Sequence, residues 1–190
     1  IEFLILKVTH LFATPKERLV VTSVVSYPVK SLNGITHTEP VAVTTLGIHK
    51  DRTLMIIRED INQFVTQRHI PTLALLHVTI LPNDRFEITD NASKKSIVVS
   101  TPTTDAPTAM KIWDDSVLVN DCGDEAADFL NSFVKAEEDE LELKGHLRLV
   151  AMRPPSKHKR PTSTKRTPYA AYTSLGSPPN TSFADGYPIL

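Results

Sequence analysis

Short apolar runs, several of them rich in β-branched residues, alternate with turn residues along most of this chain. Such runs, bounded by Gly, Pro, Asn or Asp, are typical of β-strands. We expect strands over residues 19–26, 37–45, 53–58, 64–67, 73–81, 86–89, 96–100, 110–113, 117–120 and 147–152. The longest apolar run, 73–81, suggests a strand in the centre of a sheet. Polar turns suggest hairpins over 53–67 and 110–120.

One stretch has the periodicity of a helix. Between residues 124 and 134, Ala126, Leu130 and Phe133 recur at the spacing of one helix face. An acidic pair stands at the start of this stretch, where negative charge complements the helix dipole. The pattern therefore predicts a mainly β domain with one α-helix near its C-terminal end.

Composition and charge exclude several classes of function. Hydrophobic residues make up 41% and charged residues 23% of the 190 positions, as in an ordinary globular protein. The formal net charge of −1 argues against a general nucleic-acid binder. A single cysteine, Cys122, excludes an internal disulfide and a zinc site built from cysteines. The seven histidines show no metal-ligand spacing, and the chain has no nucleophile-elbow or phosphate-loop motif.

The charge is unevenly distributed. Residues 153–182 contain six of the 21 Lys and Arg residues, no acidic residue, and many Ser, Thr and Pro. The rest of the chain has 15 basic against 22 acidic residues, a net charge of −7. A segment of this composition cannot bury enough apolar surface to fold alone, so we expect it to be flexible.

Several short motifs follow one another in a specific order. The motifs are Tyr27-Pro28-Val29-Lys30-Ser31 with Gly34, Leu46-Gly47, Asp51-Arg52, Thr66-Gln67-Arg68 with Pro71, Trp113, Asp121-Cys122-Gly123-Asp124-Glu125-Ala126-Ala127, Leu147–Val150 and Phe183-Ala184-Asp185-Gly186-Tyr187-Pro188. This series resembles the N-terminal β-barrel domain of MOSC proteins, over roughly residues 20–152 and the short end piece. The family includes mitochondrial amidoxime-reducing components and the C-terminal part of molybdenum cofactor sulfurase. The resemblance implies an antiparallel β-barrel-like domain.

The resemblance and the composition together suggest three parts. Residues 1–18 are expected to form an N-terminal extension that is the remnant of a membrane anchor, an extra strand, or a misread upstream segment. Its apolar start is too short and too charged for a membrane span, which needs about 20 apolar residues. Residues 19–152 form the barrel domain. Residues 153–190 form a basic linker and the start of a MOSC domain, most of which the chain lacks.

The residue types around one turn suit the binding of an anion. Lys30 and Ser31 leave a strand at a Pro-containing turn and supply a cation and a hydroxyl, and Arg52 follows Asp51 at the start of the next strand. Phosphate groups are bound by such side chains together with backbone amides. The resemblance implies that Lys30, Ser31 and Arg52 contact the molybdenum cofactor. The alternative is a surface lysine and a structural Asp–Arg pair.

Three further residues are candidates for the same pocket. Arg68 is either a second cation near the pocket or a buried partner of a carboxylate in the barrel. The resemblance places Gly186 and Tyr187 at the entry into the MOSC domain, where they would also touch the cofactor. Cys122 is not expected to bind metal, because its anionic neighbours disfavour a thiolate. The resemblance places the metal-binding cysteine of the family beyond Leu190.

The resemblance also implies a function for a longer protein. It implies an oxidoreductase that reduces N-hydroxylated compounds with Mo-molybdopterin, shared with the rest of the MOSC domain, and with electrons from redox partners of the cytochrome b5 type. The expected location is the mitochondrial outer membrane or the cytoplasm. One alternative is a sulfur-carrier module, as in the sulfurase, which a pyridoxal-phosphate domain upstream would favour. Another is an interaction barrel without cofactor. We expect residues 1–190 alone to be inactive, because the thiolate ligand is missing.

Overall fold

The computed structural model describes residues 21–44, 46–102, 107–112, 115–137, 146–154, 157 and 182–183. These residues form thirteen strands, one 3-10 helix and one α-helix. In chain order they are β1 (Val24–Ser26), β2 (Val29–Lys30), β3 (Ile35–His37), β4 (Val43–Thr44), β5 (Gly47–Ile48), β6 (Leu54–Arg58), β7 (Gln63–Phe64), η1 (Pro71–Leu75), β8 (Leu76–Leu81), β9 (Arg85–Asp90), β10 (Lys95–Ser100), β11 (Thr108–Ile112), β12 (Asp115–Asp121), α2 (Asp124–Glu137) and β13 (Leu147–Met152).

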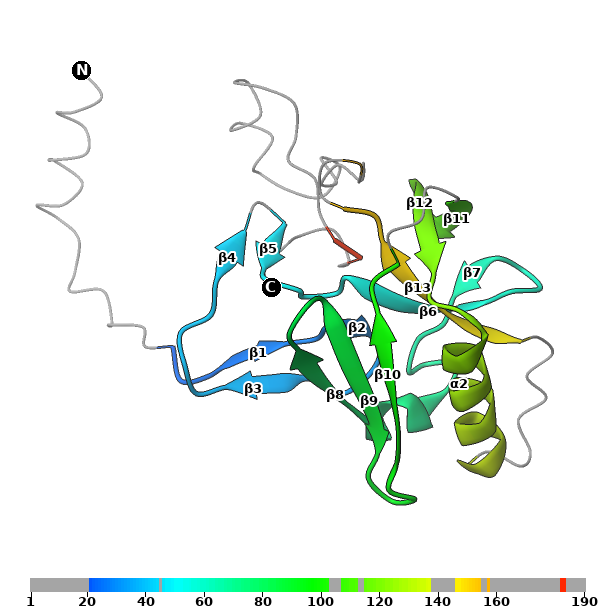
Figure 1. Ribbon diagram of the computed structural model, residues 1–190, viewed down its shortest axis with the longest axis horizontal. Coiled ribbons are helices and arrows are strands. Elements are labelled where there is room, and N and C mark those ends of the chain that lie inside the picture. The colour runs from blue at the N-terminus through cyan, green and yellow to red at the C-terminus, as the bar shows by residue number, and fades with distance from the viewer. Residues whose placement is uncertain are drawn as a thin grey trace, which may run out of the picture.

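Five strands close into a barrel (Figure 1). The ring runs β13–β12–β11–β7–β6 and closes through the pairing of β6 with β13, while β2 adds to the other side of β6. This confirms the expected mainly β, barrel-like domain. Most pairings are antiparallel, as expected, but β2–β6 and β7–β11 are parallel. Both parallel pairs join strands that are far apart in the sequence, which gives the chain the long crossover that parallel pairing needs.

The barrel strands bury two different faces. Successive side chains of a strand point to opposite faces, so alternate residues of β6 enter different cores. The barrel interior contains Met55 and Ile57 of β6, together with Met110, Ile112, Val117, Val119, Val150, Met152 and Phe183. The outer face contributes Leu54 and Ile56 of β6 and Leu147, Leu149 and Ala151 of β13 to a second core.

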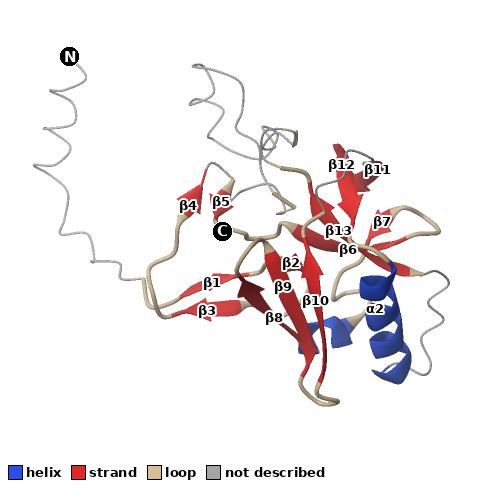
Figure 2. Ribbon diagram, viewed as in Figure 1, coloured by secondary structure: helices blue, strands red, loops and turns tan. Residues whose placement is uncertain are grey.

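The helix and a three-stranded sheet cover this outer face (Figures 1 and 2). Strands β8, β9 and β10 form an antiparallel sheet in the order β10–β9–β8. Helix α2 packs Ala126, Leu130 and Phe133 into the second core, which confirms the apolar face read from the sequence. The helix extends three residues further than expected, to Glu137.

Several of the expected strands are wrong in detail. The strand expected over 64–67 is only Gln63–Phe64, and of the run 19–26 the described part is a strand only at Val24–Ser26. The run 37–45 is interrupted, because β3 ends at His37 and β4 begins only at Val43, with Pro40 between them. Proline has no N–H to give to a strand ladder. The run 73–81 begins as the 3-10 helix η1, where Pro71 favours a helical first turn, and continues as β8. Strand β8 lies at one edge of the three-stranded sheet and not in its centre.

Several expectations fall on residues outside the described ranges. These are the N-terminal extension 1–18, Trp113, and most of the basic segment 153–182. In the described part of the chain, no helix combines the length and the apolar character that crossing a membrane would require.

Candidate functional site

The candidate anion site is built where β2 and β6 begin. The parallel pairing aligns Val29 with Leu54 and Lys30 with Met55. Just before the pairing, the Arg52 N–H donates to the Tyr27 carbonyl at 2.6 Å. These backbone hydrogen bonds place the turn that carries Lys30 directly beside the loop that carries Arg52, although more than 20 residues separate them.

A buried carboxylate holds this arrangement together. Asp51 is 5% exposed. Its Oδ1 accepts the backbone N–H of Tyr27 at 2.7 Å, and its Oδ2 accepts the Arg52 guanidinium at 3.1 Å. The guanidinium carbon of Arg52 also lies 5.5 Å from the centre of the Tyr27 ring. The cation of Arg52 is therefore oriented by a carboxylate on one side and an aromatic face on the other.

Three non-glycine residues around this point have a left-handed backbone. The φ angles are 76° at Ser31, 62° at Lys50 and 50° at Arg52. Each such residue costs about 1–3 kcal/mol and persists only where its surroundings fix it. Conformations of this kind gather in functional loops, which favours a binding role for the turn at Ser31 and the loop at Arg52.

Lys30 and Ser31 turn toward β7. Lys30 is 7% exposed, and its Nζ lies 5.5 Å from the centre of the Phe64 ring. Ser31 donates its hydroxyl to the Val65 carbonyl at 3.2 Å. The pairing of Lys30 with Met55 puts its side chain on the face of β6 that lines the barrel interior. The ammonium is thus held at the inner face of the barrel wall and not at the open surface.

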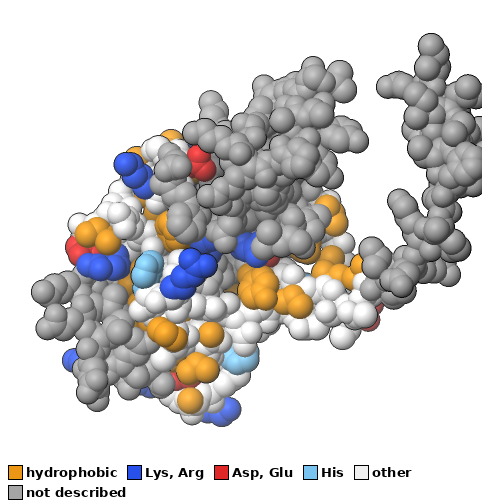
Figure 3. Space-filling model, turned by 180° about the vertical axis from the view of Figure 1, so that it is seen from behind, with side chains coloured by type: hydrophobic (Ala, Val, Ile, Leu, Met, Phe, Trp, Pro, Cys, Tyr) orange, Lys and Arg blue, Asp and Glu red, His pale blue; other side chains and the backbone are white. Residues whose placement is uncertain are grey.

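The predicted residues are therefore brought together to different degrees. Lys30 and Ser31 share one neighbourhood at Phe64 and Val65, while Arg52 lies against Tyr27 at the start of the same strand pair. Figure 3 shows Lys and Arg side chains close together near the middle of one face, beside hydrophobic side chains.

Arg68 belongs to the exposed end of the adjoining turn. Its side chain is exposed, and its backbone N–H donates to the Thr66 hydroxyl at 3.2 Å. Because the Arg68 side chain is exposed, the alternative of a buried Arg68 paired with a carboxylate is wrong. Gly186 and Tyr187 lie outside the described residues.

Two contributors were missed in the sequence. Asp51 was noticed only as a neighbour of Arg52, whereas it also fixes the backbone of Tyr27. Phe183 is fully buried, and its N–H donates to the Arg52 carbonyl at 3.0 Å. In the sequence Phe183 stands out only as the first residue of the motif at 183–188, after a stretch that also contains Tyr169 and Tyr172. That signal gives no indication of where the ring packs.

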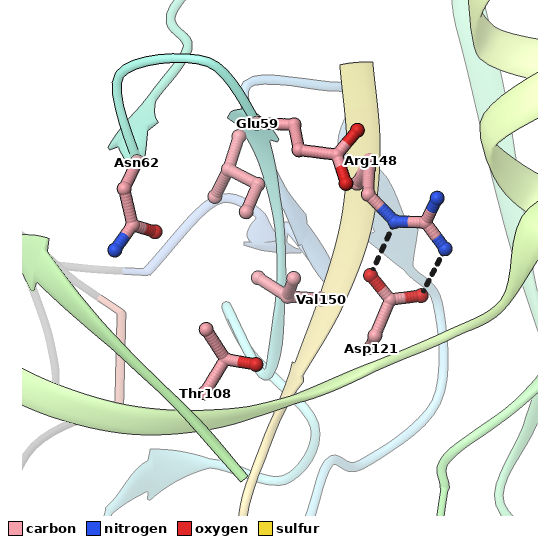
Figure 4. Close-up of a pocket in the computed structure, with 7 residues that line it drawn as sticks. Glu59, Asn62, Thr108, Asp121, Arg148 and Val150 are labelled. Atoms are coloured by element: carbon pink, nitrogen blue, oxygen red, sulfur yellow. Dashed lines mark hydrogen bonds and ion pairs between the residues drawn. The ribbon is translucent and has the colours of Figure 1, made fainter. Parts of the chain in front are cut away.

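A pocket lies where β6 ends and β13 begins (Figure 4). Its volume is about 570 Å³, and its lining residues are Ile57, Glu59, Asn62, Thr108, Asp121, Arg148 and Val150. Arg148 forms two hydrogen bonds to Asp121, at 2.5 and 2.9 Å, and another to Asp124 at 2.9 Å. Two carboxylates thus neutralise Arg148, the one cation among the described residues that line the pocket. None of the residues predicted for the anion site lies there.

The ion pair in this pocket changes the acidity of both partners. Burial alone would raise the pKa of Asp121, but hydrogen bonds from the Arg148 guanidinium and the Gly123 amide, with the charge of Arg148, lower it overall. Hydrogen bonds to Asp121 and Asp124 raise the pKa of Arg148 further above its usual range. The Arg148–Asp121 pair is therefore a fixed structural contact between β13 and the end of β12, with no proton to exchange near neutral pH.

The single thiol is not prepared for metal binding or nucleophilic attack. Burial and the neighbouring charge of Asp121 raise the pKa of Cys122 to about 12. The thiol therefore stays protonated at neutral pH, and burial, which the sequence did not show, is the larger cause. Within the described ranges, no group of three or more His, Cys, Asp or Glu side chains is placed to hold a metal ion.

One serine–histidine contact resembles a catalytic pair but is structural. The Ser26 hydroxyl and His37 Nε2 are 2.7 Å apart across the β1–β3 pairing. Ser26 is fully buried, so no substrate can approach its oxygen. The contact satisfies two polar groups within a short hairpin.

Comparisons with known proteins agree with this architecture. The family model described as the MOSC N-terminal beta barrel domain matches residues 18–137. The chain is similar to "Mitochondrial amidoxime reducing component 2" of Macaca fascicularis, 30% identical over 115 residues, or 58% of this chain and 34% of the relative. It is also similar to "Mitochondrial amidoxime-reducing component 1" of Homo sapiens, 29% identical over 140 residues, or 71% of this chain and 38% of the relative. The chain thus spans little more than a third of the length of these relatives.

Proposed function

The chain belongs to the family of the MOSC N-terminal β-barrel domain, and we propose that its barrel supplies the phosphate-binding part of a molybdenum-cofactor pocket. The observation that carries the proposal is the strand pair β2–β6, which places a buried lysine, a hydroxyl in a left-handed turn and an oriented guanidinium along one short stretch of wall. MOSC proteins as a family are related to the binding of this cofactor.

The residues present fit the anionic end of such a group. A guanidinium has five N–H donors, and Arg52 directs one of its terminal nitrogens to Asp51 at 3.1 Å, which leaves donors for a phosphate oxygen. The Tyr27 ring and Asp51 hold this guanidinium in place before a ligand arrives, so less conformational entropy is lost on binding. Lys30 adds a second positive charge on the inner side of the wall.

When bound, the molybdenum centre would supply the redox chemistry, and the protein would supply binding and orientation. The barrel residues would hold the phosphate of the cofactor. Cys122 would take no part, because its thiol is protonated and it lies at the far end of the fold, before α2. The metal-side ligand would therefore come from the MOSC domain.

For a longer protein that contains this barrel, we propose an oxidoreductase that reduces N-hydroxylated compounds. Support comes from two relatives, which are named as mitochondrial amidoxime-reducing components. Their names also support a mitochondrial location, and electrons would come from redox partner proteins of the cytochrome b5 type. Reduction of an amidoxime with an artificial electron donor, before and after removal of the cofactor, tests this part of the proposal in the longer protein.

The anion site itself can be tested with the chain as it stands. The probe is molybdopterin released from a purified molybdenum enzyme, with binding followed by pterin fluorescence. A charge-assisted hydrogen bond is worth about 1.5–3 kcal/mol, so Lys30→Ala and Arg52→Ala should each weaken binding by about one to two decades. Lys95→Ala, an exposed lysine on β10, is the matched control and should change nothing. Equal affinity in all four proteins would refute the assignment of the site.

A further inference from the structure

The pocket where β6 ends and β13 begins follows from the alternation of side chains along the barrel strands. Every second residue of a strand points to the same face, so the position two residues from an inward-facing core residue also faces inward. Four strands place a polar or charged residue there. The pairs of core and pocket residues are Ile57 and Glu59, Met110 and Thr108, Val119 and Asp121, and Val150 and Arg148.

The alternation extends to Glu59, although this residue lies just beyond β6. Its N–H donates to the His146 carbonyl at 2.9 Å, so the ladder between β6 and β13 continues past Arg58. Glu59, Thr108, Asp121 and Arg148 therefore stand in one ring above the barrel-interior cluster. We call the pocket inside this ring the barrel mouth.

The base of the barrel mouth is apolar and its wall is polar. Ile57 and Val150 are buried members of the interior cluster and also line the pocket. Figure 4 shows Val150 between Asn62 and Thr108 on one side and Arg148 with Asp121 on the other. The volume of about 570 Å³ lies in the range of small-molecule sites, which often occupy the mouths of β-barrels. An apolar base under a few polar groups is the usual construction of such sites.

The charges of the lining favour a cation. Two carboxylates, Glu59 and Asp121, stand against one guanidinium, Arg148. Arg148 donates to both oxygens of Asp121 and also to Asp124, so its charge is compensated. Among the described residues, no side chain forms an ion pair with Glu59. An anionic ligand would therefore meet no uncompensated positive charge here, whereas a cationic ligand would meet the carboxylate of Glu59.

The uncharged groups of the lining also accept hydrogen bonds. Asn62 donates its Nδ2 to the Ala109 carbonyl at 2.7 Å, which fixes the orientation of its amide. The amide oxygen of Asn62 then faces the pocket, and the Thr108 hydroxyl lies on the same side (Figure 4). With the carboxylate of Glu59, the mouth offers three acceptor groups. A protonated primary amine has three N–H donors and no acceptor, so its chemistry is complementary to this lining.

We propose that the barrel mouth is a binding site for a small organic cation, namely a protonated primary amine with a short apolar body. The ammonium group contacts Glu59, and the apolar body lies over Ile57 and Val150. A metal ion fits less well, because in the described part of the chain no three His, Cys, Asp or Glu side chains are placed to hold one. The mouth lies at the end of β6, whereas Arg52 precedes its start, so the inference does not depend on the proposed function.

A competing interpretation is that the polar ring only separates the barrel core from water. Such a ring would have no preference among ligands of similar shape. Three probes distinguish the two interpretations at pH 7: benzylamine is a cation, benzyl alcohol is neutral, and phenylacetate is an anion. Binding is followed by the NMR amide signals of the nitrogen-15-labelled chain. The signals of Glu59, Asn62 and Thr108 report on the barrel mouth, and that of Arg52 reports on the candidate anion site.

Benzylamine should shift the three signals of the barrel mouth and leave the Arg52 signal in place, with a dissociation constant of about 1 mM. Benzyl alcohol should bind about fivefold more weakly, and phenylacetate more weakly still, because the ion pair with Glu59 is lost or reversed. The preference for benzylamine should shrink at high salt, which screens exposed charges. Equal affinity for benzylamine and benzyl alcohol, or no saturable shift of these signals, would overturn the proposal.

The carboxylate is tested by Glu59→Gln, which keeps the shape of the side chain and removes its charge. This variant should bind benzylamine about fivefold more weakly and benzyl alcohol as before. Glu39→Gln, at an exposed position outside the pocket, is the matched control and should change neither affinity. Unchanged affinity for benzylamine in Glu59→Gln would refute the assignment of the site.

The position of the ligand is tested by filling the mouth. Thr108→Trp places a large ring in the pocket and should abolish the shifts caused by both benzylamine and benzyl alcohol. Ser116→Trp is the matched control, because Ser116 is exposed and precedes the inward-facing Val117, so it lies on the outer face of β12. Urea unfolding checks that both variants are folded. Benzylamine that still binds folded Thr108→Trp with unchanged affinity would show that the amine lies elsewhere, and if this variant does not fold, the result for Glu59→Gln decides.

Discussion

The carboxylate of Asp51 accepts the backbone N–H of Tyr27 at 2.7 Å, across 24 positions of the chain. The same carboxylate accepts the Arg52 guanidinium, while the Arg52 N–H returns a hydrogen bond to the Tyr27 carbonyl. A single acidic side chain thus joins the approach to β2 to the approach to β6. This connection allows the Arg52 guanidinium to stack on the ring of Tyr27, although the two residues are far apart in the sequence.

Removal of this carboxylate should affect both stability and the anion site. Asp51→Ala removes the side-chain acceptor of the Tyr27 N–H, a partly buried hydrogen bond, and should cost about 1–3 kcal/mol of unfolding free energy. Asp51→Asn keeps an acceptor oxygen and should cost less. Urea unfolding followed by circular dichroism measures both values. Asp128→Ala, at an exposed position on α2, is the control. A loss no larger for Asp51→Ala than for this control would contradict the central role of Asp51.

Gly34 is required by the packing of Tyr27. A Cβ atom at Gly34 would lie 2.6 Å from Val25 Cγ1 and 2.8 Å from Tyr27 Cε1. Gly34→Ala should therefore push the Tyr27 ring away from Arg52 and cost about 1–3 kcal/mol, as overpacking usually does. The same displacement should weaken binding of the pterin probe. Unfolding curves and probe titrations measure the two effects, with Ser96→Ala on the exposed face of β10 as control. Wild-type stability in Gly34→Ala would show that the hairpin β1–β3 adapts freely.

Much of the fold follows from local patterns in the sequence. The nearly continuous apolar runs in 54–58 and 147–152 indicate the two strands that close the barrel and are buried on both faces, and the apolar face of 124–134 indicates α2. These elements are predictable because each has a clear pattern of buried side chains, a continuous run for the strands and a helical stripe for α2. The mistake at 73–81 has the same origin: an apolar run shows burial but does not distinguish a strand from a short helix that Pro71 begins.

Less of the site follows from the sequence. Lys30, Ser31 and Arg52 stand out because polar residues next to Pro and at the start of strands are typical of binding loops. The parallel pairing of β2 with β6 does not stand out, since it depends on a crossover of more than 20 residues. The seating of Phe183 is also hidden, because a long-range contact of a single aromatic residue leaves no periodic signal.

The ion pair between Arg148 and Asp121 predicts that the fold loses stability in acid. Its partners lower the pKa of Asp121 in the folded chain, so this group stabilises the fold above its unfolded pKa of about 3.9. The contribution is lost as the pH falls through the lower, folded pKa. The unfolding free energy of Asp121→Asn should therefore approach that of the wild type as the pH falls from 7 to 3. A constant difference between the two proteins over this range would mean that the pair contributes nothing through its charge, and Asp128→Asn is the control.

The last prediction concerns the reactivity of Cys122. Its pKa of about 12 in the folded chain means that only a very small fraction of the thiol is ionised at pH 8, and the thiolate is the form that attacks disulfide reagents. In the unfolded chain the pKa returns to about 8.5, so a sizeable fraction becomes reactive. The folded chain should therefore react with an aromatic disulfide reagent at least about tenfold more slowly than the chain in urea.

The same measurement separates the two causes of the raised pKa. Asp121→Asn removes the neighbouring charge but leaves the burial, which is the larger cause, so it should raise the folded reaction rate only modestly. The side-chain oxygen of the asparagine can still accept the Gly123 N–H, so this hydrogen bond is only weakened. A folded chain that reacts as fast as the unfolded one would show that the thiol is accessible and ionised. Cys122 would then have to be considered again as a ligand for the metal.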